Sequence, residues 1–535
     1  MNPSRRPRYL LTIWAPGVAL ALVALVLVLI TGLVDVAGSD KYRSLLRLLT
    51  PDPAAAGAAL VLVGTAEGVA IAIVIVVVVL GIQLTADRYS PRIIDIFVRD
   101  PMNGIVLGLF LLSIVFTIFV SAEVKSDYVP RLSVALALGL AVVDFAILLP
   151  YLRYLFSVMR GETIISALRR RGGAIVRRAG SDRNDLAVRH AMRDCLSQIS
   201  DIALGSIQRG DTEVCLGAIE ALRALVVDEY LPAKQRLQPW WFGVDHVDMP
   251  GASDQTIAHV DRTRTWVEHT VLSDFVDLIG ETPAFRKEVI HAIARATRDL
   301  GDAAIRHGDR ELEDLVIRFF NTYLRAAMNQ RAPTFVYATF NEYRTLAVHA
   351  LEARPELVLR VAEHLVAYGR NFDAAGFPFI IGTAAEDVAD MTIKAAARDL
   401  DRAVLLAQLL SRTLTSMAPV AQPVALNGVL KATIKLTLWG IGSEHPEIVG
   451  TLGQGIRAVP ATFTEDALVR MARTTEGVFW EVSDRVVAFD WVEPDLRELI
   501  PVLRRTLAEQ EEAEKAAAVA AAVSSARKAR RLSAR

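Results

Sequence analysis

The chain has 535 residues, of which 53% are hydrophobic and 22% are charged, and its mean hydropathy is +0.34. A sequence this apolar with an ordinary charged fraction must concentrate its apolar residues in one part, which excludes a wholly soluble protein. The 59 basic and 60 acidic side chains nearly cancel, which argues against nucleic acid as the primary ligand. Cys195 and Cys215 are too few for a disulfide framework and fall in a stretch expected in the reducing cytoplasm.

Four apolar runs fill the first 160 residues, and each is long enough to cross a hydrocarbon core of about 30 Å at about 1.5 Å per helical residue. They are residues 10–34, 56–83, 104–122 and 132–156. The first run is far longer than the apolar core of a cleavable signal peptide. We therefore predict a transmembrane domain over residues 1–158, with the lipid bilayer as its first partner.

The basic residues beside these spans are distributed unequally between the two sides of the membrane. One side carries twelve, namely Arg5, Arg6, Arg8, Arg88, Arg92, Arg99, Arg160, Arg169, Arg170, Arg171, Arg177 and Arg178. The other side carries five, namely Lys41, Arg43, Arg47, Lys125 and Arg131. By the positive-inside rule, both termini and everything after the fourth span are expected in the cytoplasm.

The connection between spans two and three is predicted to contain a short amphipathic helix, which we call the elbow (residues 90–100). Ser90 can cap it, Pro91 suits its first position, and Asp100 with the following proline ends it. Arg92 and Arg99 lie off its apolar face, so the elbow is expected to rest in the cytoplasmic headgroup region. A plain connector without a moving part is the alternative.

The segment from residue 81 to residue 120 resembles the signature region of a bacterial family of predicted membrane proteins of unknown function. The matching positions are Ser90-Pro91-Arg92, Arg99-Asp100 and Leu107-Gly108 with Phe110. Near the end of span four the chain has Arg153-Tyr154 where family members often carry a His pair, and residues 206–212 depart from a further family motif. The resemblance implies a multi-pass inner-membrane protein and supplies no catalytic residue.

Two carboxylates lie inside the predicted spans. Glu67 in span two and Asp144 in span four fall at similar depths, near the middle of the membrane, and no Lys or Arg lies in the middle of any span. A charge facing lipid costs several kcal/mol, so these acids must face inward, be protonated or bind a cation. Ser113 of span three lies near the same depth, and the three side chains form a candidate intramembrane site for protons or cations.

Small residues accompany this candidate site. Gly64 and Gly68 form a GxxxG pattern on the face of Glu67, and Gly104 with Gly108 forms another in span three, so both pairs are candidates for close helix packing. The structural alternative is that each acid is protonated and bonds to a neighbouring helix, while the hydroxyls of span three bond to their own backbone.

Residues 159–505 are expected to form an all-α cytoplasmic domain. Amphipathic helical patterns separated by Pro, Gly and Asp recur along this part, and it has no long run of alternating β-branched residues that would predict a strand. Helix starts about 45 residues apart are typical of HEAT-type helical pairs, so a solenoid and a compact bundle both remain open. The irregular segment 229–256 is a possible division point. Residues 506–535 form a charged, Ala-rich tail.

That irregular segment contains Trp240, Trp241 and Phe242, which form a candidate interaction loop for a lipid headgroup or a protein partner. The alternative is that the loop folds back on its own helices. Asp245 and His246 nearby lack a second coordinating cluster, so no metal is predicted.

The sequence contains no phosphate-binding loop, zinc-protease helix, nucleophile elbow or CxxC pair, so no enzymatic activity and no cofactor is predicted. Two functions remain. In the first, spans two to four of a homo-oligomer form a channel or transporter-like path for protons or cations past Glu67 and Asp144, regulated by the cytoplasmic domain. In the second, the spans anchor a scaffold that presents a helical protein-interaction domain. The midplane acids favour the first.

Overall fold

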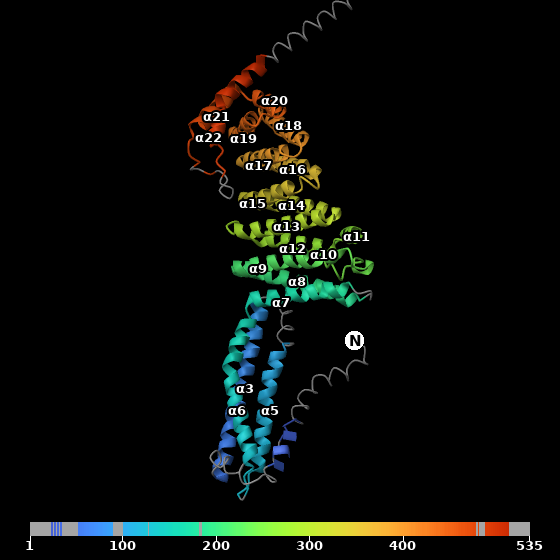
Figure 1. The fold of residues 1–535 in the computed structure, drawn as a ribbon, viewed down its shortest axis with the longest axis vertical. Helices are drawn as coiled ribbons and strands as arrows, with labels where there is room; N and C mark the ends of the chain where they lie inside the picture. The colour runs from blue at the N-terminus through green and yellow to red at the C-terminus, as the bar shows by residue number, and fades with distance from the viewer. Residues whose placement is uncertain are drawn as a thin grey trace, which may run out of the picture. The chain divides into compact units, whose positions relative to one another are not determined.

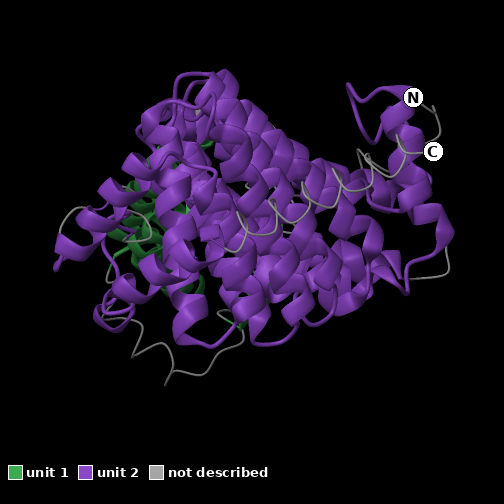
Figure 2. Cartoon of the chain, turned by 90° about the horizontal axis from the view of Figure 1, so that it is seen from above, with its two compact units in different colours: residues 1–168 green, residues 169–535 purple. Residues whose placement is uncertain are grey.

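The computed structural model describes residues 52–88, 100–126, 128–180, 185–477, 480 and 487–512, together with helical positions between 23 and 34. These residues are helical, apart from turns, loops and an isolated bridge between Lys125 and Tyr128, which confirms the all-α prediction. The chain separates into two compact units, residues 1–168 and 169–535 (Figure 2). We call them the membrane unit and the helical unit.

Three long helices of the membrane unit are described completely. They are α3 (Pro53–Arg88), α5 (Pro101–Glu123) and α6 (Arg131–Val158), and each packs against the other two. Their bounds extend the predicted spans by one to five residues at each end. Helix α5 begins after Asp100, whose carboxylate accepts a hydrogen bond from the Met102 backbone N–H at 3.0 Å. Most of the first predicted span lies outside the described residues.

The surface of the membrane unit is apolar and its interior contains polar groups. Leu62 on α3, Ile118 on α5 and Leu149 on α6 are 71%, 61% and 76% exposed, whereas Glu67 and Asp144 are fully buried. A water-soluble protein has the opposite arrangement. Because all backbone groups of a helix are paired within it, such a bundle can lie in lipid, and each of the three helices is long and apolar enough to span a membrane.

The helical unit consists of successive helices joined by short loops. After α7 (Gly161–Ala179), which contains the boundary between the units, its first part comprises α8 (Leu186–Arg209), α9 (Thr212–Ala224), η3 (Leu225–Tyr230), α10 (Leu231–Lys234), η4 (Pro239–Trp241), α11 (Asp254–Thr263), α12 (Trp266–Glu281) and α13 (Lys287–His307). Its second part comprises α14 (Arg310–Asn329), α15 (Pro333–His349), α16 (Pro355–Ala374), α17 (Phe379–Ala396), α18 (Leu400–Met417), α19 (Pro423–Gly442), α20 (Pro446–Arg457), α21 (Ala461–Arg473) and α22 (Pro494–Arg497).

These helices form an α-solenoid of two rows. With the short helices η3, α10, η4 and α11 set aside, most helices of this unit pack against the next helix of the chain, and those from α8 to α19 pack against the one after that. One row therefore contains α8, α12, α14, α16, α18 and α20, and the other contains α9, α13, α15, α17 and α19. The layers follow one another in chain order in Figure 1. Such nearest-neighbour stacking is the defining property of a solenoid and answers the question that the sequence left open.

Polar contacts repeat with the period of the solenoid. Helices α14, α16, α18 and α20 begin at Arg310, Pro355, Leu400 and Pro446, which are 45, 45 and 46 residues apart. Ion pairs join residues at nearly the same separation: Arg298 with Glu342 at 3.3 Å, Arg360 with Asp314 at 2.7 Å, and Arg398 with Glu352 at 3.0 Å. A separation of one repeat places two residues at equivalent positions on adjacent layers.

The irregular segment near 229–256 does not divide this unit. Helices α8 and α9 before it pack against α12 and α13 after it, so the segment is an insertion on the side of a continuous stack. Two buried ion pairs hold the insertion: Arg189 with Asp248 at 2.8 Å, and Lys234 with Glu268 at 2.5 Å. The change in composition at this segment therefore marks an insertion within one repeat and not a division of the helical unit.

Helix α19 is also long and apolar enough to be a candidate span. Of its most apolar window, 72% is buried inside the protein, compared with 17% for α3. Lys431 and Lys435 on this helix form ion pairs with Asp490 and Glu386 at 2.7 Å and 2.8 Å. These contacts identify α19 as a core helix of the solenoid, because a membrane span would expose its apolar residues to lipid.

Candidate functional site

The candidate site lies in the interior of the membrane unit, where three helices contribute one polar side chain each. Glu67 is in the middle of α3, Ser113 in the middle of α5 and Asp144 in the middle of α6. All three side chains are fully buried. Each lies on the face of its helix that packs in the bundle, so the two acids face inward, which is one of the alternatives that the sequence left open for them.

A short hydrogen bond joins two of these groups. The Ser113 hydroxyl Oγ donates to Glu67 Oε1 at 2.5 Å, across the α3–α5 contact. A bond from Glu67 to a neighbouring helix agrees with the first part of the structural alternative, whereas Ser113 bonds to this carboxyl group and not to its own backbone as the second part expects. A hydroxyl that donates to a buried carboxyl group is a charge-assisted partner and holds Glu67 in one orientation.

Asp144 interacts electrostatically with both Glu67 and Ser113. Within the described residues, however, neither of its carboxyl oxygens has a hydrogen-bond partner, and the same holds for Glu67 Oε2. Thr117, one helical turn after Ser113 on α5, has a buried hydroxyl that also lacks a partner there. The site therefore contains several oxygen atoms that are able to accept or exchange hydrogen bonds with a guest.

No basic side chain of the described spans balances the two acids, because the arginines of α6 lie at Arg131 and Arg153, near its ends. Two ionised carboxylates held side by side in a water-poor interior repel each other strongly. The pair is thus stable when it shares a proton or binds a cation. Proton sharing and cation binding are the chemistry that this pair offers.

Only part of the predicted glycine packing joins the described helices. A Cβ at Gly64 would lie 3.4 Å from Thr117 Cγ2, so this glycine faces α5 closely. A Cβ at Gly68 or at Gly104 would have no atom within 4 Å, and Gly104 is exposed. Gly108 is half-buried. Gly64 therefore contributes to the bundle, whereas Gly68 and Gly104 point away from it.

Of the predicted elbow, Ser90, Pro91, Arg92 and Arg99 lie outside the described residues, and only Asp100 is described. Besides capping α5, Asp100 accepts a hydrogen bond from the Tyr154 hydroxyl at 2.7 Å. Tyr154 occupies a position where relatives were expected to carry His. In this chain, Tyr154 thus provides a polar partner for the aspartate of the signature region.

The aromatic loop folds back on the helical unit. Trp241 is fully buried and packs against Trp266 with ring centroids 5.4 Å apart, and Phe242 is buried beneath the Arg264 guanidinium. Asp248 forms an ion pair with Arg189, and His246 with Asp254. A partner therefore cannot reach Trp241 or Phe242 without unfolding the loop, and half-buried Trp240 is what the loop presents.

Sequence reasoning missed two buried hydrogen bonds at the ends of the bundle. Ser133 Oγ donates to Thr31 Oγ1 at 2.8 Å, and the Tyr151 hydroxyl donates to Asn103 Oδ1 at 2.9 Å. The spacing of polar residues on α5 could have indicated the second of these bonds, because Asn103 and Ser113 both lie among the buried positions of that helix. Isolated Ser, Thr, Asn and Tyr residues are too common in spans for that signal to identify partners.

The helical unit contains a separate cavity of about 620 Å³ between its repeats and the segment 487–496. Its walls include Arg344 on α15, Glu386 on α17 and Trp439 on α19, with Trp491 on the opposite side. The cations are paired with acids of the adjacent layer: Lys435 with Glu386 at 2.8 Å and Arg344 with Asp387 at 3.4 Å.

Comparison with known proteins supports the membrane assignment. Residues 11–208, which contain the candidate site, match a family model described as predicted membrane protein (DUF2254). No curated protein and no solved structure matches the chain.

Proposed function

We propose that this protein moves protons or small cations through its bundle, using the carboxyl pair Glu67 and Asp144 as the exchange site. The observation that carries the proposal is the convergence of two buried acids and the Ser113 hydroxyl in the middle of three apolar helices, without a basic partner among the described residues of these helices. Burying such a pair is costly, and membrane proteins place ionisable groups there at proton and ion pathways. The proposal assigns the chain no catalytic reaction and no cofactor.

The test uses the purified full-length protein in liposomes. We expect an imposed pH or cation gradient to dissipate faster with the wild type than in empty liposomes. Glu67→Gln and Asp144→Asn should each reduce the flux at least tenfold, because an amide neither shares a proton nor carries charge. The matched control is Ser157→Ala, since the exposed Ser157 hydroxyl near the end of α6 bonds to the Tyr154 carbonyl of its own helix and lies outside both the acid pair and the α3 groove.

A wild type that is silent to H⁺, Na⁺ and K⁺ at several membrane potentials would overturn the transport proposal. So would unchanged flux in both acid variants. Correct folding of each variant is checked by size-exclusion chromatography and by tryptophan fluorescence, which reports mainly on the helical unit.

We further propose that the protein resides in the bacterial inner membrane with both termini in the cytoplasm, as the distribution of basic residues predicts. Cys195 and Cys215 are buried, and burial raises the pKa of their thiols to about 11 and about 12, so a maleimide should barely label the native protein. In intact cells, an impermeant maleimide should label Lys125→Cys in the α5–α6 loop but label Glu281→Cys only after lysis. The reverse pattern would refute this topology.

The exposed face of α3 supports the proposal that the protein forms a homo-oligomer. Thr65, Gly68 and Ala72 line a shallow groove of about 470 Å³ on this face, outside the described bundle. Small residues let a second helix approach closely in lipid, where helix association depends on packing. A second copy of the chain is the partner we propose for this groove.

The solenoid favours a second candidate function, that of a membrane-anchored scaffold. Its cavity of about 620 Å³ combines apolar walls with Arg344, Glu386 and Asp390, a suitable composition for a polar peptide segment. A photo-reactive residue placed at Trp439 in the full-length protein should then give one discrete cross-linked product in cells. The same residue placed at exposed Glu311 is the control, and equal labelling from both positions would refute the scaffold.

A further inference from the structure

Buried polar pairs of the membrane unit lie at three levels along its axis, while the buried hydroxyl of Thr117 lies one helical turn beyond Ser113. The carboxyl pair is the middle level. One outer level is Asn103 with Tyr151, and the other is Thr31 with Ser133. All four outer side chains are at most 9% exposed, so these hydrogen bonds lie inside the bundle.

The first outer level continues towards the beginning of α5. The Tyr154 hydroxyl donates to Asp100 Oδ2 at 2.7 Å, and Asp100 and Tyr154 lie about one helical turn from Asn103 and Tyr151 respectively. Asp100 is half-buried. A series of hydroxyl, amide and carboxyl groups thus extends from the end of the bundle to its interior.

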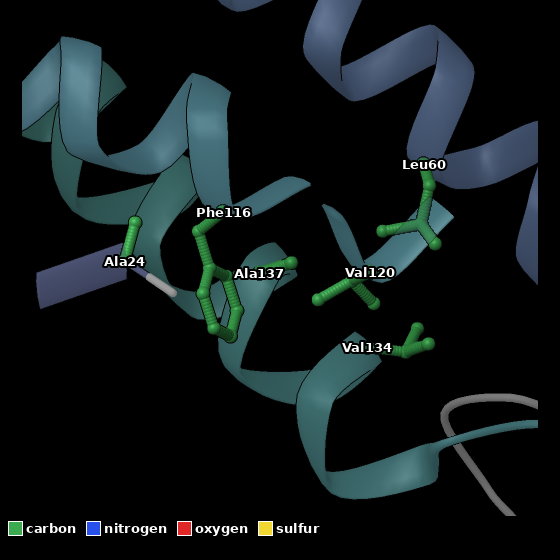
Figure 3. Close-up of a cluster of buried hydrophobic side chains, with 6 residues drawn as sticks. All are labelled: Ala24, Leu60, Phe116, Val120, Val134 and Ala137. Carbon is green, nitrogen blue, oxygen red and sulfur yellow. The ribbon is translucent and has the colours of Figure 1, made fainter. Parts of the chain in front are cut away.

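Two clusters of buried apolar side chains separate the three levels. Val106, Phe110, Ala70 and Val74, together with the Tyr151 ring, lie between the acids and the Tyr151–Asn103 hydrogen bond. On the other side, the cluster in Figure 3 lies between the acids and the Thr31–Ser133 hydrogen bond, and it comprises Ala24, Leu60, Phe116, Val120, Val134 and Ala137.

Two phenylalanines hold equivalent places in these clusters. Phe110 and Phe116 lie three residues before and three residues after Ser113, and both are fully buried. The distance along α5 from Asn103 to Ser113 is about 15 Å, which is far beyond hydrogen-bonding distance. A proton therefore reaches the acids from that level only when water enters the space that the Phe110 cluster fills.

We infer that the transported species is the proton and that Phe110 and Phe116 are hydrophobic gates on the two sides of the carboxyl pair, an inference that rests on the proposed function. A proton from water on one side binds to a carboxylate oxygen of the pair while that gate is hydrated. The same carboxyl group then releases a proton to water on the other side, which returns the pair to its starting charge. Opening one gate at a time prevents a continuous leak.

The packing favours protons over metal cations. A hard cation such as Ca²⁺ takes about six to eight oxygen ligands and must pass with part of its hydration shell. The apolar clusters contain fully buried aromatic rings beside the acids, and the outer levels consist of groups that both donate and accept hydrogen bonds. A single file of water is enough for proton transfer, and hydrophobic constrictions are known to open by wetting.

The experiment measures proton flux into liposomes with a pH-sensitive dye, using the full-length protein. Phe110→Ala and Phe116→Ala should each raise the flux several-fold above the wild type, and the double variant should raise it most. The matched control is Phe119→Ala on the same helix, because Phe119 is 40% exposed on the lipid side and should leave the flux unchanged. Phe110→Leu and Phe116→Leu keep most of the side-chain volume and serve as variants with a smaller risk of misfolding.

The outcomes separate the gates from the proposed function. If the wild type moves protons and the acid variants do not, but all four Phe110 and Phe116 variants match the wild type, the gates are refuted and the exchange site stands. If the wild type moves Na⁺ or K⁺ and no protons, the assignment of the proton is refuted. A silent wild type refutes both. Flux through Phe110→Ala that persists after adding Glu67→Gln and Asp144→Asn would show a leak that bypasses the pair, and would refute the path.

Discussion

Replacing Lys234 by Met removes a cation that two acids of the helical unit share. Lys234 Nζ lies 2.5 Å from Glu268 Oε1 and 2.6 Å from Asp309 Oδ2. Glu268 is fully buried, whereas Asp309 is partly exposed and also caps α14 through the Leu312 backbone N–H. The loss of the cation should therefore affect mainly Glu268.

Leaving a buried charge without its partner costs about 3–5 kcal/mol, because the desolvation of the remaining ion is no longer compensated. Lys234→Met should lower the free energy of unfolding by that amount at neutral pH. Changing both residues, Lys234→Met with Glu268→Gln, removes both charges and should recover most of the loss.

The loss should depend on pH. Burial raises the pKa of Glu268 even with Lys234 present, and removing the lysine raises it further. The folded state then retains a proton that the unfolded state has released, so the stability of the Lys234→Met protein should fall as pH rises above the ordinary carboxyl range.

The assay is urea unfolding of the full-length protein in detergent, followed by tryptophan fluorescence, because six of the seven tryptophans lie in the helical unit. The control is Arg177→Met, which breaks the exposed pair with Glu229 at 3.4 Å and should cost less than about 1 kcal/mol. Equal stabilities of Lys234→Met and Arg177→Met would refute the argument from burial.

Three further predictions concern single residues. Burial raises the pKa of Asp274 to about 8, so its folded state holds a proton that the unfolded state releases. The free energy of unfolding should therefore fall with rising pH up to about pH 8, by at most about 1.4 kcal/mol per pH unit, and Asp274→Asn should flatten this dependence. Gly428→Ala places a Cβ 2.8 Å from the backbone of α17 and should lower the free energy of unfolding by about 1–3 kcal/mol in the same assay. The control Gly450→Ala has no neighbour within 4 Å of its Cβ and should not lower the stability. Equal effects of the two substitutions would contradict the close packing of α17 against α19. Gly68→Leu should weaken cross-linked dimers in membranes while Gly104→Leu does not, and unchanged dimers would exclude the α3 groove as the interface.

The solenoid shows where sequence reasoning met its limit. The interval of about 45 residues between helix starts was visible in the sequence, but it fits both a bundle and a stack. Which helices pack together depends on complementary surfaces far apart in the chain, such as the close backbone approach of Gly382 on α17 to Gly428 on α19. The sequence around each glycine does not indicate which helix packs against it.

The composition of one segment suggested a division of the helical unit that the structure does not have. The Pro- and Trp-rich segment near 229–256 has the appearance of a linker, yet buried Trp241 and the Arg189–Asp248 pair bind it to the stack. Proline and glycine mark where regular helices stop. They do not reveal whether the loop is covered by its neighbours.

The sequence alone identified the apolar helices long enough to span a membrane and showed that Glu67 and Asp144 cannot both be charged and face lipid, because the hydrocarbon core requires long apolar helices and rejects exposed charge. The tertiary structure decided which groups meet there: the Ser113 bond to Glu67, the outer hydrogen bonds of Asn103 and Ser133, and the apolar clusters between them. The physical reason is that solvent acts on each segment by itself, whereas contacts between helices depend on register and rotation, which no single segment encodes.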